Sequence, residues 1–293
     1  MHPKPLIFFN RLVTWFQTYS TWAICITMMG GCVDFRLSGE EMQKEFEAMD
    51  IKPVSERISV DSNHIHYVYV DQGRPNLVVF IHGSPGSWSA FLNFFRTDSL
   101  LESFDMLSID RPGFGDSDYG RPIASMEEQA FLMQEVIKKF SHQHIIVVGH
   151  SLGGPVASRL AMDFPDLIQG LVLVAPSIDP DQEKYEWYRS WVKTRIGGAL
   201  TPTDFWVSNE EIMPLKTELT KMLSCWEKIK IPVIVIQGTK DVLVPKENAE
   251  FARRMLPDTL LDIRYLEGVN HFIPWSHPEQ IVFGLRDLAI SSD

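Results

Sequence analysis

Three residues far apart in the chain, Ser151, Asp241 and His271, have the side chains that acyl transfer requires. Cleaving an ester at neutral pH needs a nucleophile, a base that takes its proton, and a third group that holds the base in the right tautomer. Serine, histidine and aspartate fill these roles. Because a single loop histidine or turn aspartate is common on protein surfaces, the surrounding sequence decides whether the three act together.

Ser151 lies at the centre of Gly149-His150-Ser151-Leu152-Gly153, a Gly-x-Ser-x-Gly pattern. The five residues 144–148 (HIIVV) are typical of a strand buried on both faces, and a helical pattern follows the glycines. A strand and a helix in these places indicate a nucleophile elbow, a turn so tight that its flanks lack side chains. The helix N-terminus favours a developing oxyanion. We therefore predict Ser151 as the nucleophile and the Leu152 N–H as one oxyanion donor.

The other candidate residues also follow predicted strands. The loop His82-Gly83-Ser84-Pro85-Gly86 comes after strand 77–81, where a glycine lets the backbone approach a ligand, and its Ser84 N–H is our second oxyanion donor. Asp241 and His271 follow strands 231–236 and 262–266. The main rival to Asp241 as the acid is Asp179, which follows the preceding strand.

Strands and helices alternate along most of the chain, which predicts an α/β fold with a mostly parallel sheet covered by helices on both sides. Such sheets place their sites at the carboxyl ends of the strands. Residues 58–60 and 65–70 predict an antiparallel hairpin at one edge. The further strands are expected at 105–109 and 171–174, and helices at 88–95, 126–140, 246–255 and 278–290.

The alternation stops between the strand that follows the elbow and residue 230. We predict a hydrolase-like core from 58–177 and 230–293, with 178–229 inserted as a small helical cap over the site. Aromatic side chains interleaved with charges suit helices that bury an apolar face. The alternative is helices packed on the flank of the domain. The aromatic residues expected to line a substrate pocket are Tyr185, Trp187, Tyr188, Trp191, Phe205 and Trp206.

Residues 1–33 are expected to lie outside the fold, followed by a polar, helical spacer at 34–57. Lys4 and Arg11 precede a short apolar run, too short for a transmembrane helix, that ends in Met29-Gly30-Gly31-Cys32. This end resembles the lipobox of bacterial lipoproteins, in which the cysteine is lipidated. We expect an exported protein held at a membrane surface through its N-terminus, with an uncleaved amphipathic anchor as the alternative to lipidation at Cys32.

Composition limits the partners. The net charge of −11 argues against a nucleic-acid partner and against electrostatic docking on anionic lipid, because either would require clustered Lys and Arg, and it favours a neutral or apolar substrate. No Cys-x-x-Cys or His-Glu-x-x-His spacing indicates a metal site, and Gly113-Phe114-Gly115 is followed by Asp118 where a dinucleotide fingerprint has its third glycine. We expect neither a metal nor a cofactor.

The elbow, the His82–Gly86 loop and the order Ser, Asp, His resemble the α/β-hydrolase fold over roughly residues 58–290. Within that superfamily the chain looks like the capped serine esterases and the carbon–carbon bond hydrolases. The epoxide hydrolase and haloalkane dehalogenase branches resemble it at His82–Pro85 but use aspartate at the elbow, where this chain has Ser151. The resemblance implies a carboxylesterase acting on a small to medium uncharged ester. The alternatives are hydrolysis of a ring-cleavage diketone, and a catalytically silent, membrane-tethered binding protein.

Overall fold

The computed structural model describes residues 35–47 and 51–290. The predicted export or anchor segment, with Cys32, lies outside these residues. Among the helices that are described, none is both long enough and apolar enough to cross a membrane.

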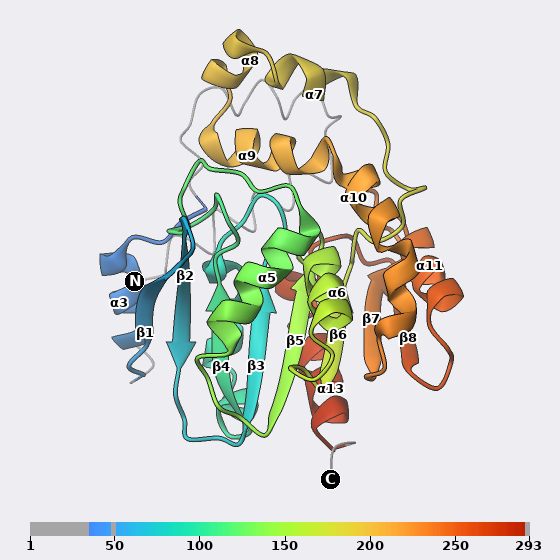
Figure 1. Ribbon diagram of the computed structural model, residues 1–293. Coiled ribbons are helices and arrows are strands. Elements are labelled where there is room, and N and C mark those ends of the chain that lie inside the picture. The colour runs from blue at the N-terminus through green and yellow to red at the C-terminus, as the bar shows by residue number, and fades with distance from the viewer. Residues whose placement is uncertain (1–34, 48–50, 291–293) are drawn as a thin grey trace.

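The described residues contain one eight-stranded sheet in the order β1-β2-β4-β3-β5-β6-β7-β8 (Figure 1). The hairpin of β1 and β2 is antiparallel, as predicted, and β2 pairs antiparallel with β4, whereas all other neighbours are parallel. The strands are β1 Val54–Val60, β2 Asn63–Val70, β3 Asn76–Ile81, β4 Phe104–Ile109, β5 His144–His150, β6 Gly170–Val174, β7 Val233–Gly238 and β8 Leu261–Leu266.

The register of the parallel strands brings their carboxyl ends to one edge. Ile81 at the end of β3 pairs with both Ile109 and Gly149, and Val174 pairs with His150 and Ile236. The loops that carry the candidate site residues leave from this edge, because each follows one of these strands or β8.

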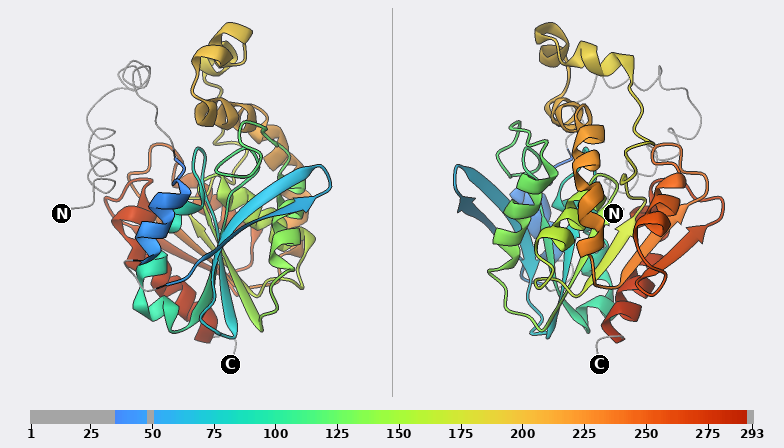
Figure 2. Two further views of the ribbon diagram at one scale, coloured as in Figure 1. Left: turned by 90° about the vertical axis from the view of Figure 1, so that its left-hand side faces the viewer. Right: turned by 45° about the vertical axis from the view of Figure 1, so that its right-hand side comes forward.

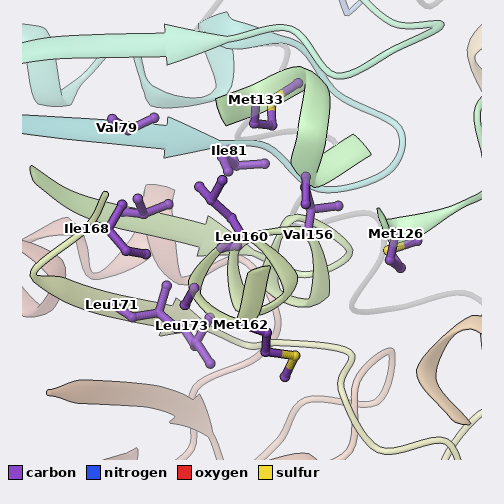
Figure 3. Close-up of a cluster of buried hydrophobic side chains, with 14 of the residues drawn as sticks. Val79, Ile81, Met126, Met133, Val156, Leu160, Met162, Ile168, Leu171 and Leu173 are labelled. Atoms are coloured by element: carbon purple, nitrogen blue, oxygen red, sulfur yellow. The ribbon is translucent and has the colours of Figure 1, made fainter. Parts of the chain in front are cut away.

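Helices cover both faces of the sheet. Those outside the cap are α3 Gly39–Glu47, α4 Asp98–Leu101, α5 Met126–Ile137, α6 Gly153–Asp163, α11 Glu247–Met255, α12 Ile273–Ser276 and α13 Pro278–Ile290. Helices α5 and α6 lie on one face, and α3, α4 and α13 on the other (Figures 1 and 2). Between β3, α5 and α6 the side chains of Val79, Ile81, Met133 and Leu160 form part of a buried cluster (Figure 3). Burial of such side chains is the main stabilising term of the fold.

Two expectations about the N-terminal half are wrong. Residues 88–95 form two 3₁₀ turns, Trp88–Phe91 and Phe94–Arg96, instead of one helix. The region 34–57 is not a separate spacer, because Phe46 of α3 is 1% exposed and its ring packs on Trp88 and Phe95. One aromatic side chain is enough to dock an otherwise polar helix onto the core.

Four helices and a 3₁₀ turn fill the segment between β6 and β7. They are α7 Trp187–Val192, α8 Arg195–Leu200, α9 Thr203–Ile212, α10 Leu215–Met222 and the turn Leu223–Lys228. Helix α9 lies above the carboxyl edge of the sheet, α7 and α8 lie beyond it, and α10 leads back down to the core (Figure 1). The segment thus stands where the sequence places a cap.

Candidate active site

Ser151 occupies a sharp turn between β5 and α6. Its φ of +53° lies in the left-handed region, which is uncommon for a residue with a side chain. The glycines on either side are required by space: a Cβ on Gly149 would come within 2.5 Å of the Gly153 carbonyl oxygen, and one on Gly153 within 2.3 Å of the Ile81 oxygen. The turn has the form of a nucleophile elbow, and local strain of this kind is typical of functional positions.

His271 and Asp241 form a hydrogen-bonded pair on two neighbouring loops. His271 Nδ1 lies 2.7 Å from Asp241 Oδ2, in the loops that follow β8 and β7. A carboxylate only accepts, so His271 carries a proton on Nδ1, and Nε2 is the ring nitrogen left to act as the base. Asp241 Oδ1 accepts from the N–H groups of Leu243 and Val244, which fixes the carboxylate. This geometry is that of a base held in one tautomer.

The rival acid, Asp179, is engaged elsewhere. It is 2% exposed, its Oδ2 accepts from Arg254 Nη2 at 3.0 Å, and its Oδ1 accepts from the Asp181 N–H. The hydrogen bond to the His271 ring therefore belongs to Asp241.

His150, the residue before Ser151, places the His271 loop beside the elbow. Its Nε2–H donates to the His271 carbonyl oxygen at 3.1 Å, and the two rings pack with centroids 4.8 Å apart. Burial, followed by the proximity of His271, lowers the pKa of His150 to about 3, so the ring is neutral at pH 7. Sequence analysis missed His150, although its position inside the Gly-x-Ser-x-Gly pattern was a signal.

Ser151 and His271 lie at the same edge of the sheet. Within the part of the chain that the structure describes, no hydrogen bond joins their side chains. Such bonds are often long in an enzyme without substrate and tighten when the substrate binds.

The loop after β3 lies directly against Ser151. A Cβ on Gly83 would come within 2.9 Å of Ser151 Cβ, so only glycine allows this approach. The Gly83 carbonyl oxygen accepts from His82 Nδ1 and Arg111 Nη2. In a planar trans peptide the N–H points opposite to the C=O, so the Ser84 N–H faces away from Arg111. Neither it nor the Leu152 N–H has a hydrogen-bond acceptor among the described residues.

A buried ion pair joins this loop to the cap. Arg111, in the loop after β4, donates through Nη1 and Nη2 to Glu211 of α9 at 2.7 and 3.1 Å, and both side chains are fully buried. Ser84 Oγ and Gln129 Nε2 donate to the same carboxylate. Burial raises the pKa of Glu211, and Arg111 acts in the opposite direction. Sequence analysis selected neither Arg111 nor Glu211 as a site residue.

His82 completes the support of the loop. Its Nδ1–H donates to the Gly83 carbonyl, which leaves Nε2 to accept from the Arg111 backbone N–H at 2.9 Å. Burial, and then the Arg111 charge, lower the pKa of His82 well below its usual value. A neutral ring is the only state that can make both bonds, because protonated His82 has no acceptor.

The aromatic residues expected to line a pocket do not form one buried cluster. Tyr185, Trp187 and Trp191 are exposed, whereas Tyr188 and the α9 residues Phe205 and Trp206 are half-buried. Trp187 and Tyr188 contact each other edge to face, and Trp206 lies over Gly198 of α8. The expectation of an apolar lining is wrong for the exposed three, because they lie in or beside α7, beyond α9, rather than under it (Figure 1).

Comparison with known proteins agrees with this geometry. Residues 76–205 match the family model described as the alpha/beta hydrolase fold. The chain belongs to the α/β-hydrolase fold superfamily and is a hydrolase of that fold.

Among its relatives, an uncharacterized protein of Mycobacterium tuberculosis is 26% identical over 67% of this chain and 70% of its own length. Epoxide hydrolase 1 of Caenorhabditis elegans is 27% identical over 74% of this chain and 52% of its own. Among solved structures, a membrane phospholipase A described as a bacterial virulence factor has a TM-score of 0.65 at 16% identity, with 99% of both chains covered. At that identity the likeness concerns the fold alone.

Proposed function

We propose that the chain is a serine carboxylesterase that cleaves a small to medium uncharged ester through an acyl-Ser151 intermediate. The observation that carries the proposal is the 2.7 Å bond between His271 and Asp241, on loops at the sheet edge where Ser151 stands in its elbow. A base held by a carboxylate near a half-buried serine in an elbow is the arrangement that nucleophilic catalysis uses.

In this mechanism His271 Nε2 takes the Ser151 proton as Oγ attacks the ester carbonyl. The carbonyl oxygen becomes an oxyanion, which accepts hydrogen bonds from the N–H groups of Ser84 and Leu152. His271 then gives its proton to the departing alcohol, and the acyl group stays on Ser151. Water, deprotonated by His271, attacks the acyl-enzyme, the acid leaves, and the proton returns to Ser151 Oγ.

The nucleophile also decides against an epoxide substrate, despite the epoxide hydrolases among the relatives. Opening of an epoxide by Ser151 Oγ would leave an alkyl ether on the enzyme. An ether has no carbonyl carbon for water to attack, so the enzyme would stop after one turnover. An acyl ester on Ser151 has such a carbon, so the serine suits acyl transfer.

We also propose that the protein is exported and held at a membrane surface through residues 1–33, by a lipid on Cys32. The support is the sequence alone: a basic start, a short apolar run and a small-residue end before the cysteine.

A panel of p-nitrophenyl esters of increasing acyl length, run beside a ring-cleavage diketone, tests the substrate class. We expect turnover of short and medium esters, with kcat lowered about 10⁶-fold in Ser151→Ala or His271→Ala and about 10⁴-fold in Asp241→Ala. Ser151→Ala with wild-type rates would refute the acyl-enzyme. Rapid diketone cleavage with negligible ester turnover would assign the carbon–carbon chemistry instead.

A further inference from the structure

The outer layer of the cap carries an unusual concentration of exposed apolar side chains. Within residues 185–200, five large apolar residues are 47 to 73% exposed, namely Tyr185, Trp187, Trp191, Ile196 and Leu200. In the rest of the described chain, exposed large apolar residues lie singly on separate elements, such as Phe131 on α5 and Phe283 on α13, apart from the adjacent Val242 and Leu243 in the loop after β7. An exposed apolar patch of this kind marks a surface that contacts something.

This patch stands at the end of the molecule farthest from the amino ends of the parallel strands. Helices α7 and α8 form the outermost layer in both orientations, with α9 between them and the sheet (Figures 1 and 2). Their apolar residues are therefore not a second lining of the core, and a flat surface could approach them without meeting the sheet or its helices.

The charge of the same segment is opposite to that of the chain. Residues 184–200 contain four basic residues and one acidic residue, in a protein of net charge −11. Arg189 pairs with Glu186, whereas Lys184, Lys193 and Arg195 are exposed and have no ion-pair partner among the described residues. Three exposed basic side chains without an ion-pair partner in the part of the chain that the structure describes thus lie in the same segment as the apolar patch, so the net charge of the whole chain does not determine what this segment binds.

We infer that this surface, residues 184–200 of the cap, docks on an anionic lipid surface. Tryptophan and tyrosine favour the interface between lipid and water, aliphatic side chains enter the acyl region, and lysine and arginine bind anionic headgroups. A second copy of the chain is disfavoured as the occupant, because two such patches face to face would place cations against cations.

The inference deepens the proposed function by placing the uncharged ester substrate at a lipid surface, where apolar molecules partition, and to that extent it rests on that function. Docking itself needs no turnover. It is therefore measured with Ser151→Ala as the parent protein, so that failure of docking and failure of the esterase assignment are separate results.

The experiment mixes the full-length parent with vesicles of phosphatidylcholine, with or without phosphatidylglycerol, whose acyl chains carry bromine, a short-range quencher of tryptophan fluorescence. The Trp191 signal is the difference between the parent and its Trp191→Phe variant. If the protein attaches to the vesicle only through its N-terminus, the fluorescence of Trp191 is not quenched, because the quencher acts only at short range inside the lipid. We expect about twofold quenching of the Trp191 signal on vesicles with phosphatidylglycerol, because interfacial side chains reach the acyl boundary.

Matched variants separate the patch from general surface effects. The double variants Ile196→Ser/Leu200→Ser and Lys193→Glu/Arg195→Glu should each reduce the quenching at a given lipid concentration. In each, the lipid concentration that gives half-maximal quenching should rise about tenfold. The controls Phe131→Ser/Phe283→Ser and Lys228→Glu/Lys230→Glu likewise replace two exposed apolar residues by serine and two exposed cations by glutamate, but elsewhere on the surface, and should leave the quenching unaltered. An unquenched Trp191 on vesicles that carry bound protein would overturn the inference. A dimer in sedimentation that the patch variants dissociate would overturn it too, in favour of a second copy.

Discussion

Removing the buried carboxylate of Glu211 should damage both the stability and the activity of the protein. Glu211→Ala removes the acceptor of hydrogen bonds from Arg111, Ser84 and Gln129 and leaves the Arg111 charge buried without a partner. Breaking a buried ion pair from one side typically costs about 3–5 kcal/mol, so the free energy of unfolding in urea should fall by that amount. Glu210→Ala, one position along the same helix and less buried, is the control and should change it by less than about 1 kcal/mol.

A double variant separates positioning from stability. Arg111→Met/Glu211→Leu replaces the pair by apolar side chains of similar size, which is often neutral for stability, so the free energy of unfolding should return to within about 2 kcal/mol of the wild type. The Gly83 carbonyl, however, has lost its Arg111 donor, and the Ser84 N–H loses its orientation. We expect kcat to stay about 10²-fold low, the loss typical of one oxyanion donor, with KM little changed.

The assay is ester hydrolysis at saturating and limiting substrate, beside urea unfolding of the same preparations. A double variant with recovered stability and wild-type kcat would refute the argument that Arg111 and Glu211 position the loop after β3. It would leave the pair with a purely structural role.

Three further predictions concern pH, packing and location. His150 has a pKa of about 3 in the folded protein and near 6.5 in the unfolded chain, so the unfolded chain binds the proton more tightly. The free energy of unfolding should therefore fall by up to about 5 kcal/mol as the pH drops from 6.5 to 3. Urea unfolding at a series of pH values should show a weaker dependence of this free energy on pH for His150→Gln. Gly153→Ala forces a Cβ to 2.3 Å from the Ile81 oxygen, so its melting temperature should drop by several degrees, and an unchanged value would contradict the elbow geometry. Cys32→Ala should release the protein from the membrane fraction; unaltered fractionation would rule out lipidation and favour the uncleaved anchor.

Local pattern was sufficient to predict most of the fold. Period-two alternation and β-branched runs located the strands, and the side chain of Ser125 caps the predicted helix α5 by accepting from the Glu128 N–H. Helix α13 spans the predicted residues 278–290. The elbow was predictable because close contacts at the turn require both glycines, and these glycines lie within the same five residues as Ser151.

The features that sequence reasoning missed depend on partners far away in the chain. Nothing near Glu211 marks it as buried, since Glu210 beside it is equally acidic and its partner Arg111 is 100 residues distant. Phe46 gave no signal either, as a lone aromatic in a charged helix. The exposure of Tyr185 and Trp191 went unforeseen because aromatic composition does not say which side of a helical layer faces outward.

The covalent chemistry of Ser151 is the central claim, and labelling with a fluorophosphonate probe tests it most directly. The probe reacts only with a serine whose proton a neighbouring base removes, so it also distinguishes an enzyme from a silent binding scaffold on the same fold. Our account predicts a single adduct per chain, mapped by peptide mass to Ser151, absent in Ser151→Ala and strongly slowed in His271→Ala. A folded wild-type protein that stays unlabelled, or that is labelled at another residue while Ser151 is untouched, would contradict it.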